Sequence, residues 1–239
     1  MRSKSTSSFF RKTQFVNSVA IGYLFLSIVA VVLEFFNDKD LLYLVKPLVI
    51  PSLLFMYWCS TRRPNTVYLI ALFIVWMANL FAHVDLLLAM IFGTLSLLVY
   101  NVLFIYLINT SLKTIAFFVL AVSAIPFALF YILLSIITYS SIQEDYMFYI
   151  AQSIILIILG AYGLANFFTK SRKSSVYLVV SIVCFMVDHV LSFILNGNFE
   201  AVGLMFFYAG HYLFCRFLVL DEKRRRHHDS FTLQAKVKN

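Results

Sequence analysis

Long apolar stretches alternate with short polar segments along the whole chain, and this pattern predicts its architecture. Each stretch is about 20 residues long, which lets a helix rising about 1.5 Å per residue cross a bilayer core of about 30 Å. Period-two alternation, which the strands of a membrane β-barrel require, is missing from the stretches. The predicted spans cover residues 14–36, 41–59, 66–83, 86–108, 115–137, 146–168, 176–195 and 201–220. We therefore predict an all-α, polytopic membrane bundle of eight transmembrane helices.

The composition supports a membrane protein. Hydrophobic residues make up 62% of the 239 residues and charged residues 13%, whereas a soluble domain carries about 25% charged residues. The first stretch has 23 residues, too many for the apolar region of a cleaved signal peptide, which has about 7 to 15. No small-residue cleavage site follows it, so we expect it to remain as the first span.

Basic residues gather in alternate loops, which predicts the orientation of the chain. Of 19 Lys and Arg, 16 fall on the side of both termini, and Lys39, Lys46 and Arg216 are the other three. The opposite loops carry six acidic residues, namely Asp38, Asp40, Asp85, Glu144, Asp145 and Glu200. By the positive-inside rule both termini are expected on the cytoplasmic side. The membrane itself we expect to be a bacterial inner membrane. The net charge of +8 therefore reflects topology, and we expect no nucleic-acid partner.

The chain divides into one membrane domain and two polar ends. The domain covers residues 1–220, including a short basic segment at 1–13, and residues 221–239 form a basic tail that we expect to be disordered after its first turn. The KRRRHH run at 223–228 is interpreted as a stop-transfer anchor, with binding of anionic lipid headgroups as the alternative.

Cysteine and histidine spacing gives no sign of a disulfide framework, a metal site or a cofactor. The three cysteines form no CxxC pair, and no HxxxH or HExxH motif occurs. His189 follows Asp188 directly, so we expect the two side chains to diverge by about 100° around the helix and not to share a cavity.

Ionisable and amide side chains inside the spans are the main functional candidates, because each is costly to place in a bilayer. Counted from the extracytoplasmic end of each helix, five lie at a depth of about 6 to 10 Å. These are Lys46, Asn79, Gln152, Asp188 and Tyr208. Glu34 lies nearer the end, and His211 follows Tyr208 on one helix face. We expect one polar layer in the outer half of the membrane.

Each of these groups also has a structural interpretation. Lys46 and Asp188 could form a buried ion pair that only fixes helix packing. Asn79 and Gln152 could serve only as interhelical hydrogen-bond partners. Both interpretations remain open at this point.

Three segments resemble the YhhN-like lysoplasmalogenase family. They are VKPLVIP at 45–51, VSIVCFMVDHVLS at 180–192 and FYAGHYLF at 207–214. The resemblance implies an eight-helix membrane protein that cleaves the vinyl ether bond of lysoplasmalogens. It matches Lys46, Asp188 and Tyr208 to motif positions of the family.

The chain departs from the family at chemically important positions. Ala78 and Asn79 occupy the positions where the family has a Gly-Asp pair, and His211 occupies the position of a family Gln. The His that the family has in its fourth helix is absent from this chain. Two carboxylates could divide proton delivery and water activation, but Asn79 can only hydrogen-bond and cannot shuttle a proton. Asp188 with His211 or Glu34 is the substitute acid and base pair.

The resulting hypothesis is a lysolipid-binding membrane protein, either hydrolytic or without turnover. Its expected catalytic residues are Asp188, Asn79 and His211, and its expected lipid-binding residues are Glu34, Lys46, Gln152 and Tyr208. The alternative from another class is a small proton-coupled transporter or sensor that uses Lys46 and Asp188 as a buried pair. A purely structural or partner-binding membrane subunit is a third interpretation.

Overall fold

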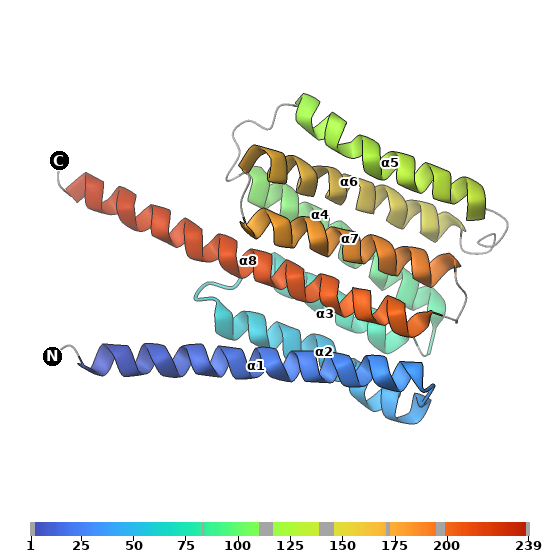
Figure 1. Ribbon diagram of the computed structural model, residues 1–239, viewed down its shortest axis with the longest axis horizontal. Helices are drawn as coiled ribbons and strands as arrows, with labels where there is room; N and C mark the ends of the chain where they lie inside the picture. The colour runs from blue at the N-terminus through green and yellow to red at the C-terminus, as the bar shows by residue number, and fades with distance from the viewer. Residues whose placement is uncertain are drawn as a thin grey trace.

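A computed structural model describes residues 3–82, 84–109, 117–138, 146–170, 173–194 and 199–237. Across these residues it contains eight α-helices and no β-strand (Figure 1). They are α1 (Ser3–Phe35), α2 (Lys39–Ser60), α3 (Thr66–Phe81), α4 (Leu86–Asn109), α5 (Phe117–Thr138), α6 (Tyr146–Lys170), α7 (Lys173–Ile194) and α8 (Glu200–Val237). The predicted all-α fold is confirmed for this part of the chain.

Seven of these eight helices are long and apolar enough to cross a membrane. The exception is α3, an apolar helix of 16 residues, which spans about 24 Å at about 1.5 Å per residue. Large apolar side chains such as Phe25, Leu44, Trp58 and Leu133 are exposed on the outside of the bundle. An exposed apolar surface of this extent is typical of a protein embedded in lipid.

The helices run side by side and reverse direction from one to the next (Figure 1). Neighbours in sequence pack in space, most extensively α7 with α8, α3 with α4 and α1 with α2. Helix α8 also contacts α1 and α2, and α4 contacts α6. Helix α5 packs against α6 at one edge of the bundle. The buried core draws most heavily on α6, α7 and α8, and next on α2 and α3.

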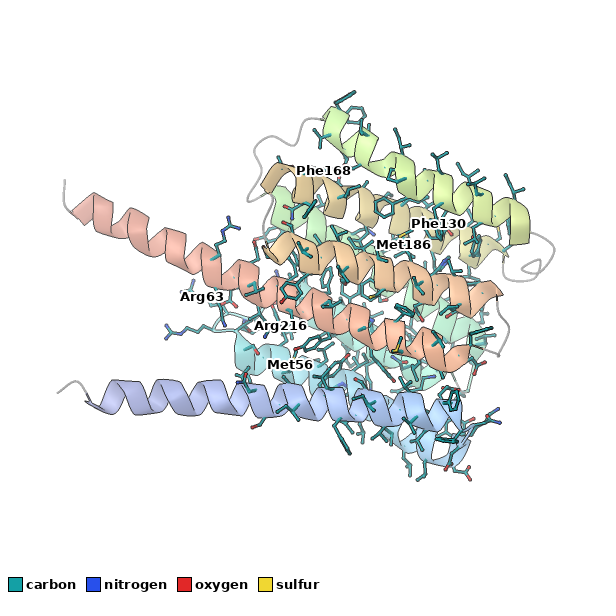
Figure 2. The ribbon with its side chains drawn as sticks, viewed as in Figure 1. Met56, Arg63, Phe130, Phe168, Met186 and Arg216 are labelled. Atoms are coloured by element: carbon teal, nitrogen blue, oxygen red, sulfur yellow. The ribbon has the colours of Figure 1, made fainter. Side chains whose placement is uncertain are left out.

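Both termini project from the same end of the bundle, which we call the basic end (Figure 1). The loop at 61–65, with Arg63, lies at this end (Figure 2). The turns between α1 and α2 and between α3 and α4 lie at the opposite end, which we call the acidic end.

Helices α1 and α8 are longer than the sequence pattern predicts. Helix α1 begins at Ser3 instead of residue 14, and α8 continues to Val237 through the tail that we expected to be disordered. Residues 211–237 contain no Gly or Pro and include the good helix formers Glu, Lys, Arg, Leu and Gln. The extension of α8 therefore agrees with local propensity, and Glu222 on it accepts a hydrogen bond from the backbone N–H of Arg63 at 3.4 Å.

Two prolines inside α2 determine how this helix joins α3. Pro51 has no N–H, so it cannot donate to the carbonyl of Pro47 one turn earlier. The indole Nε1–H of Trp76 on α3 donates to that carbonyl instead, at 3.0 Å. This bond holds α2 against α3 directly beside Lys46.

Helix α8 is joined to its neighbours by buried hydrogen bonds. The Tyr23 hydroxyl of α1 donates to the Tyr208 carbonyl at 2.7 Å, and the Ser181 hydroxyl of α7 donates to the Gly210 carbonyl at 2.8 Å. A Cβ at Gly210 would lie 2.7 Å from the Phe185 ring. Glycine at this position therefore lets α7 and α8 approach closely.

Candidate functional site

A cavity of about 110 Å³ lies between α4, α6, α7 and α8. Six of its lining side chains are aromatic or imidazole rings, namely Tyr100, Phe185, His189, Phe193, Phe207 and His211. Among the lining residues, Asp188 is the only one with a carboxylate, and no Lys or Arg is present. Typical small-molecule pockets enclose about 300 to 1,000 Å³, so this cavity fits one end of a lipid and not a whole one.

Asp188 reaches the cavity from α7 and is also close to α8. A Cβ at Gly203 of α8 would lie 3.5 Å from the Asp188 carboxylate oxygen. The small residue at position 203 therefore makes room for the carboxylate between the two helices. Asp188 is partly exposed, and it lines the cavity, so a ligand in the cavity would touch its carboxyl group.

His211 reaches the same cavity from α8 with its ring held on one side. Its Nδ1 lies 2.9 Å from the Tyr100 hydroxyl, and His211 is only 2% exposed. The rings of Phe185 and Phe207 pack against it at centroid distances of 4.9 and 4.5 Å. Because Nδ1 is engaged by Tyr100, Nε2 is the ring nitrogen that remains for a ligand.

Gln152 is the third predicted site residue at the cavity. Its Nε2 donates to the Thr94 hydroxyl oxygen at 3.0 Å, which joins α6 to α4. The Thr94 hydroxyl in turn donates to the Met90 carbonyl at 2.8 Å. The amide of Gln152 is thus oriented by α4.

A charged cluster lies on the other side of Asp188, toward the acidic end. Lys46 of α2 interacts electrostatically with Glu34 of α1, Glu200 of α8 and Asp188 of α7. Glu34 and Glu200 also interact with each other. Four helices therefore contribute charges to one place, and Asp188 belongs both to this cluster and to the cavity. The sequence pattern places Glu200 in a loop, outside the expected site, whereas in the structure it is the first residue of α8.

Tyr208 lies beside the charged cluster and does not line the cavity. Its hydroxyl interacts electrostatically with Glu34 and Asp188 and is buried without a hydrogen-bond partner among the described residues. Lys46 and Glu34 are likewise outside the cavity lining.

Asn79 is separate from both groups. Its Nδ2 donates to the Val75 carbonyl of its own helix at 3.1 Å, and it is not part of the cavity lining. The structure therefore brings together Asp188, His211 and Gln152 around the cavity, and Glu34, Lys46 and Tyr208 around the charged cluster.

His189 corrects an expectation from the sequence. The angle between consecutive helical residues predicted that Asp188 and His189 would not share a cavity, but both line it. The cavity is bounded by α4 and α6 as well as by α8, so a broad part of the α7 surface lines it. Asp188 and His189 both lie on that part of α7. Neither ring nitrogen of His189 makes a hydrogen bond among the described residues, although the Tyr149 carbonyl is nearby. The His189 ring stacks on Tyr149 at a centroid distance of 5.1 Å.

Within the described ranges, no three His, Cys, Asp or Glu side chains are grouped as a metal site would require. The chemistry available at the cavity is proton transfer and hydrogen bonding by Asp188, His189, His211 and Gln152, within aromatic walls.

Comparisons of the chain with protein-family models, with curated proteins and with solved structures found no match.

Proposed function

We propose that this chain is a lysolipid-binding membrane protein whose cavity receives the ether end of a lysoplasmalogen-type lipid. The proposal includes eight spans, with both termini in the cytoplasm of a bacterial cell. The observation that carries it is that Asp188 and His211 line one small aromatic cavity inside membrane-spanning helices. The segregation of 16 of the 19 basic residues to one side supports the orientation.

The size of the cavity decides which part of the lipid enters it. A volume of about 110 Å³ holds a few groups around the scissile bond. The long alkenyl chain then lies outside the cavity, among the exposed apolar side chains of the bundle. The aromatic walls lower the local dielectric around the bound group, which strengthens the electrostatic effect of Asp188 on it.

Hydrolysis of the vinyl ether is the reaction that these residues support. Protonated Asp188 gives its proton to the outer alkenyl carbon, which leaves an oxocarbenium centre at the carbon bonded to oxygen. Water adds to that centre and loses a proton to His211 Nε2. The hemiacetal then breaks its bond to the ether oxygen: protonated His211 gives its proton to the leaving oxygen, and the hemiacetal hydroxyl returns a proton to the Asp188 carboxylate. The products are an aldehyde and a glycerol-type alcohol, and both residues regain their starting protonation states. One carboxyl group and one imidazole thus replace a pair of carboxylates.

Aldehyde release from a lysoplasmalogen by the purified protein in nanodiscs tests this proposal. We expect release by the wild type and a loss of at least about 100-fold in Asp188→Asn, because a positioned acid contributes about 10² to 10⁴ to a rate. Asp85→Asn is the matched control, since Asp85 is an exposed carboxylate that caps α4 through the backbone N–H of Leu88.

A saturated ether analogue separates binding from turnover. If the wild type releases no aldehyde but binds the analogue, and Asp188→Asn weakens that binding, the non-catalytic form of the proposal holds. Absence of both release and binding would overturn the proposal in either form.

A proton-coupled lysolipid transporter is the second candidate, favoured by the three acidic groups around Lys46. A lysine surrounded by Glu34, Asp188 and Glu200 inside a bundle can change partners when one of the carboxylates takes up a proton. Adding lysolipid to proteoliposomes loaded with a pH-sensitive dye would then change the lumenal pH. Loss of that signal in Lys46→Met, with aldehyde release unchanged, would distinguish transport from hydrolysis.

A further inference from the structure

The cavity between α4, α6, α7 and α8 has walls that suit a positively charged ligand. Its rings come from α4, α7 and α8, and they are Tyr100, Phe185, His189, Phe193, Phe207 and His211. The face of an aromatic ring is negative and attracts a cation that lies within about 6 Å of its centre. Asp188 adds a carboxylate, and the lining contains no Lys or Arg that would repel a cation.

Asp188 is not fully paired by the protein. Its carboxylate interacts electrostatically with Lys46 but makes no hydrogen bond to another described residue. Lys46 also interacts with Glu34 and Glu200, so a single ammonium group is shared among three carboxyl groups. A charge inside a protein is costly unless it is paired. A cationic ligand in the cavity would supply the pair that Asp188 lacks.

Two polar side chains of the wall have donors that are engaged by the protein. Nε2 of Gln152 donates to the Thr94 hydroxyl oxygen at 3.0 Å, and the Ser96 hydroxyl donates to the Gly93 carbonyl at 2.7 Å. A hydroxyl group has only one proton, so the Ser96 oxygen can offer only lone pairs to a ligand. These bonds favour a ligand with a positive charge over one with a negative charge.

The size of the cavity limits the ligand to a small ion or group. The cavity volume is about 110 Å³, and an apolar protein cavity of about 150 Å³ holds one benzene molecule. Tetramethylammonium has one non-hydrogen atom fewer than benzene, so its size matches this space. It carries no N–H group, so its methyl groups can pack against rings without leaving a donor unpaired.

We propose that this cavity binds a small methylated ammonium group, with its charge beside the Asp188 carboxylate and its methyl groups against the surrounding rings. Aromatic cages are a recurrent means of recognising quaternary ammonium ligands. This binding does not require that the chain binds or cleaves a lysolipid. Asp188 is ionised in the cation complex and the cavity is filled, so a bound cation prevents the acid step proposed above.

Titration calorimetry with tetramethylammonium chloride tests the site directly. The purified protein is held in detergent at about pH 8, where an imidazole with the usual pKa of about 6.5 is neutral. We expect binding by the wild type and an affinity at least about 30-fold lower in Asp188→Asn, because one member of a buried charge pair is lost. Asp85→Asn, which changes an exposed carboxylate, is the matched control and should bind as the wild type does.

A second variant guards against misfolding of the first. Phe207→Leu removes one ring of the wall and keeps an apolar side chain, and we expect it to weaken binding about 5-fold or more. Phe130→Leu is its control, because Phe130 is 42% exposed on α5 at the edge of the bundle (Figure 2). Unchanged affinity in folded Asp188→Asn or Phe207→Leu would overturn the proposal.

Two further ligands complete the test. tert-Butanol resembles tetramethylammonium in shape and size but has no charge, so we expect it to bind far more weakly. Equal binding of the two, or no binding of tetramethylammonium by the wild type, would overturn the proposal whatever the lysolipid assays show. Butyltrimethylammonium distinguishes the source of the group: weaker binding than that of tetramethylammonium assigns the cavity to free ions, and equal or tighter binding assigns it to the ammonium end of a longer molecule.

Discussion

At the scale of single residues, the interior of this bundle is shaped by polar groups that must find partners away from water. The carbonyl of Pro47 is an example, because Pro51 lacks the N–H that would bond to it. Trp76 supplies the missing donor from the neighbouring helix. In a membrane an unsatisfied carbonyl costs several kcal/mol, so this one side chain stabilises both α2 and its contact with α3.

Trp76→Phe should therefore lower the free energy of unfolding by about 1 to 3 kcal/mol, since it leaves the Pro47 carbonyl without a partner. Denaturation of the purified protein in detergent measures the change. Trp58→Phe is the control: Trp58 is 56% exposed on the outside of α2, and its replacement should change stability by less than about 0.5 kcal/mol. Equal effects of the two substitutions would contradict the role given to Trp76.

At the scale of helices, the cavity depends on how closely α7 and α8 pack. Gly210 faces Phe185 and Cys184, and a Cβ there would be 3.3 Å from the Cys184 Cβ. Phe185 is itself part of the cavity wall. The separation of these two helices thus determines both the packing of the bundle and the shape of the site.

Gly210→Ala should destabilise the protein by about 1 to 3 kcal/mol, as overpacking of a close contact does. Gly22→Ala is the matched control, because a Cβ at Gly22 meets nothing within 4 Å, and we expect it to be neutral or stabilising by about 0.5 to 1 kcal/mol. Thermal unfolding of both variants checks this. A Gly210→Ala protein as stable as the wild type would mean that α7 and α8 are farther apart than described.

At the scale of the whole molecule, the course of α3 decides the topology. Its 16 residues are fewer than the other helices have, yet α3 connects the loop at 61–65 to the opposite end of the bundle (Figure 1). If α3 crosses the membrane, the chain crosses eight times and its termini share one side.

Cysteine labelling of intact bacterial cells tests this topology. In a Cys59→Ser background, Val84→Cys should react with an impermeant maleimide from outside, because Val84 lies at the acidic end and is 82% exposed. Lys236→Cys should react only after the cells are permeabilised. If both positions reacted from the same side, the eight-span topology would be wrong.

Most of the fold could be predicted from the sequence, because long apolar runs reflect the thickness of a bilayer. The extensions of α1 and α8 could not be predicted in this way, because they continue beyond the apolar runs into polar sequence. Residues 221–237 are polar, and polarity was interpreted as disorder although no Gly or Pro interrupts the helix.

The candidate site was harder to predict, because it depends on how helices rotate and pack. Depth along each helix placed Lys46 and Asp188 at a similar height, and in the structure the two interact electrostatically. Depth alone could not show that Asn79 bonds within its own helix. It also could not show that the cavity faces α7 broadly enough to include His189.

The central claim is that Lys46 and Asp188, from distant parts of the chain, act on each other inside the bundle. A double-mutant cycle with Lys46→Met, Asp188→Asn and the double variant, followed by unfolding in detergent, measures this interaction directly. We predict a coupling energy of at least about 0.5 kcal/mol, as found for residues that share a network. Effects that add to within about 0.3 kcal/mol would show two independent residues and contradict the account.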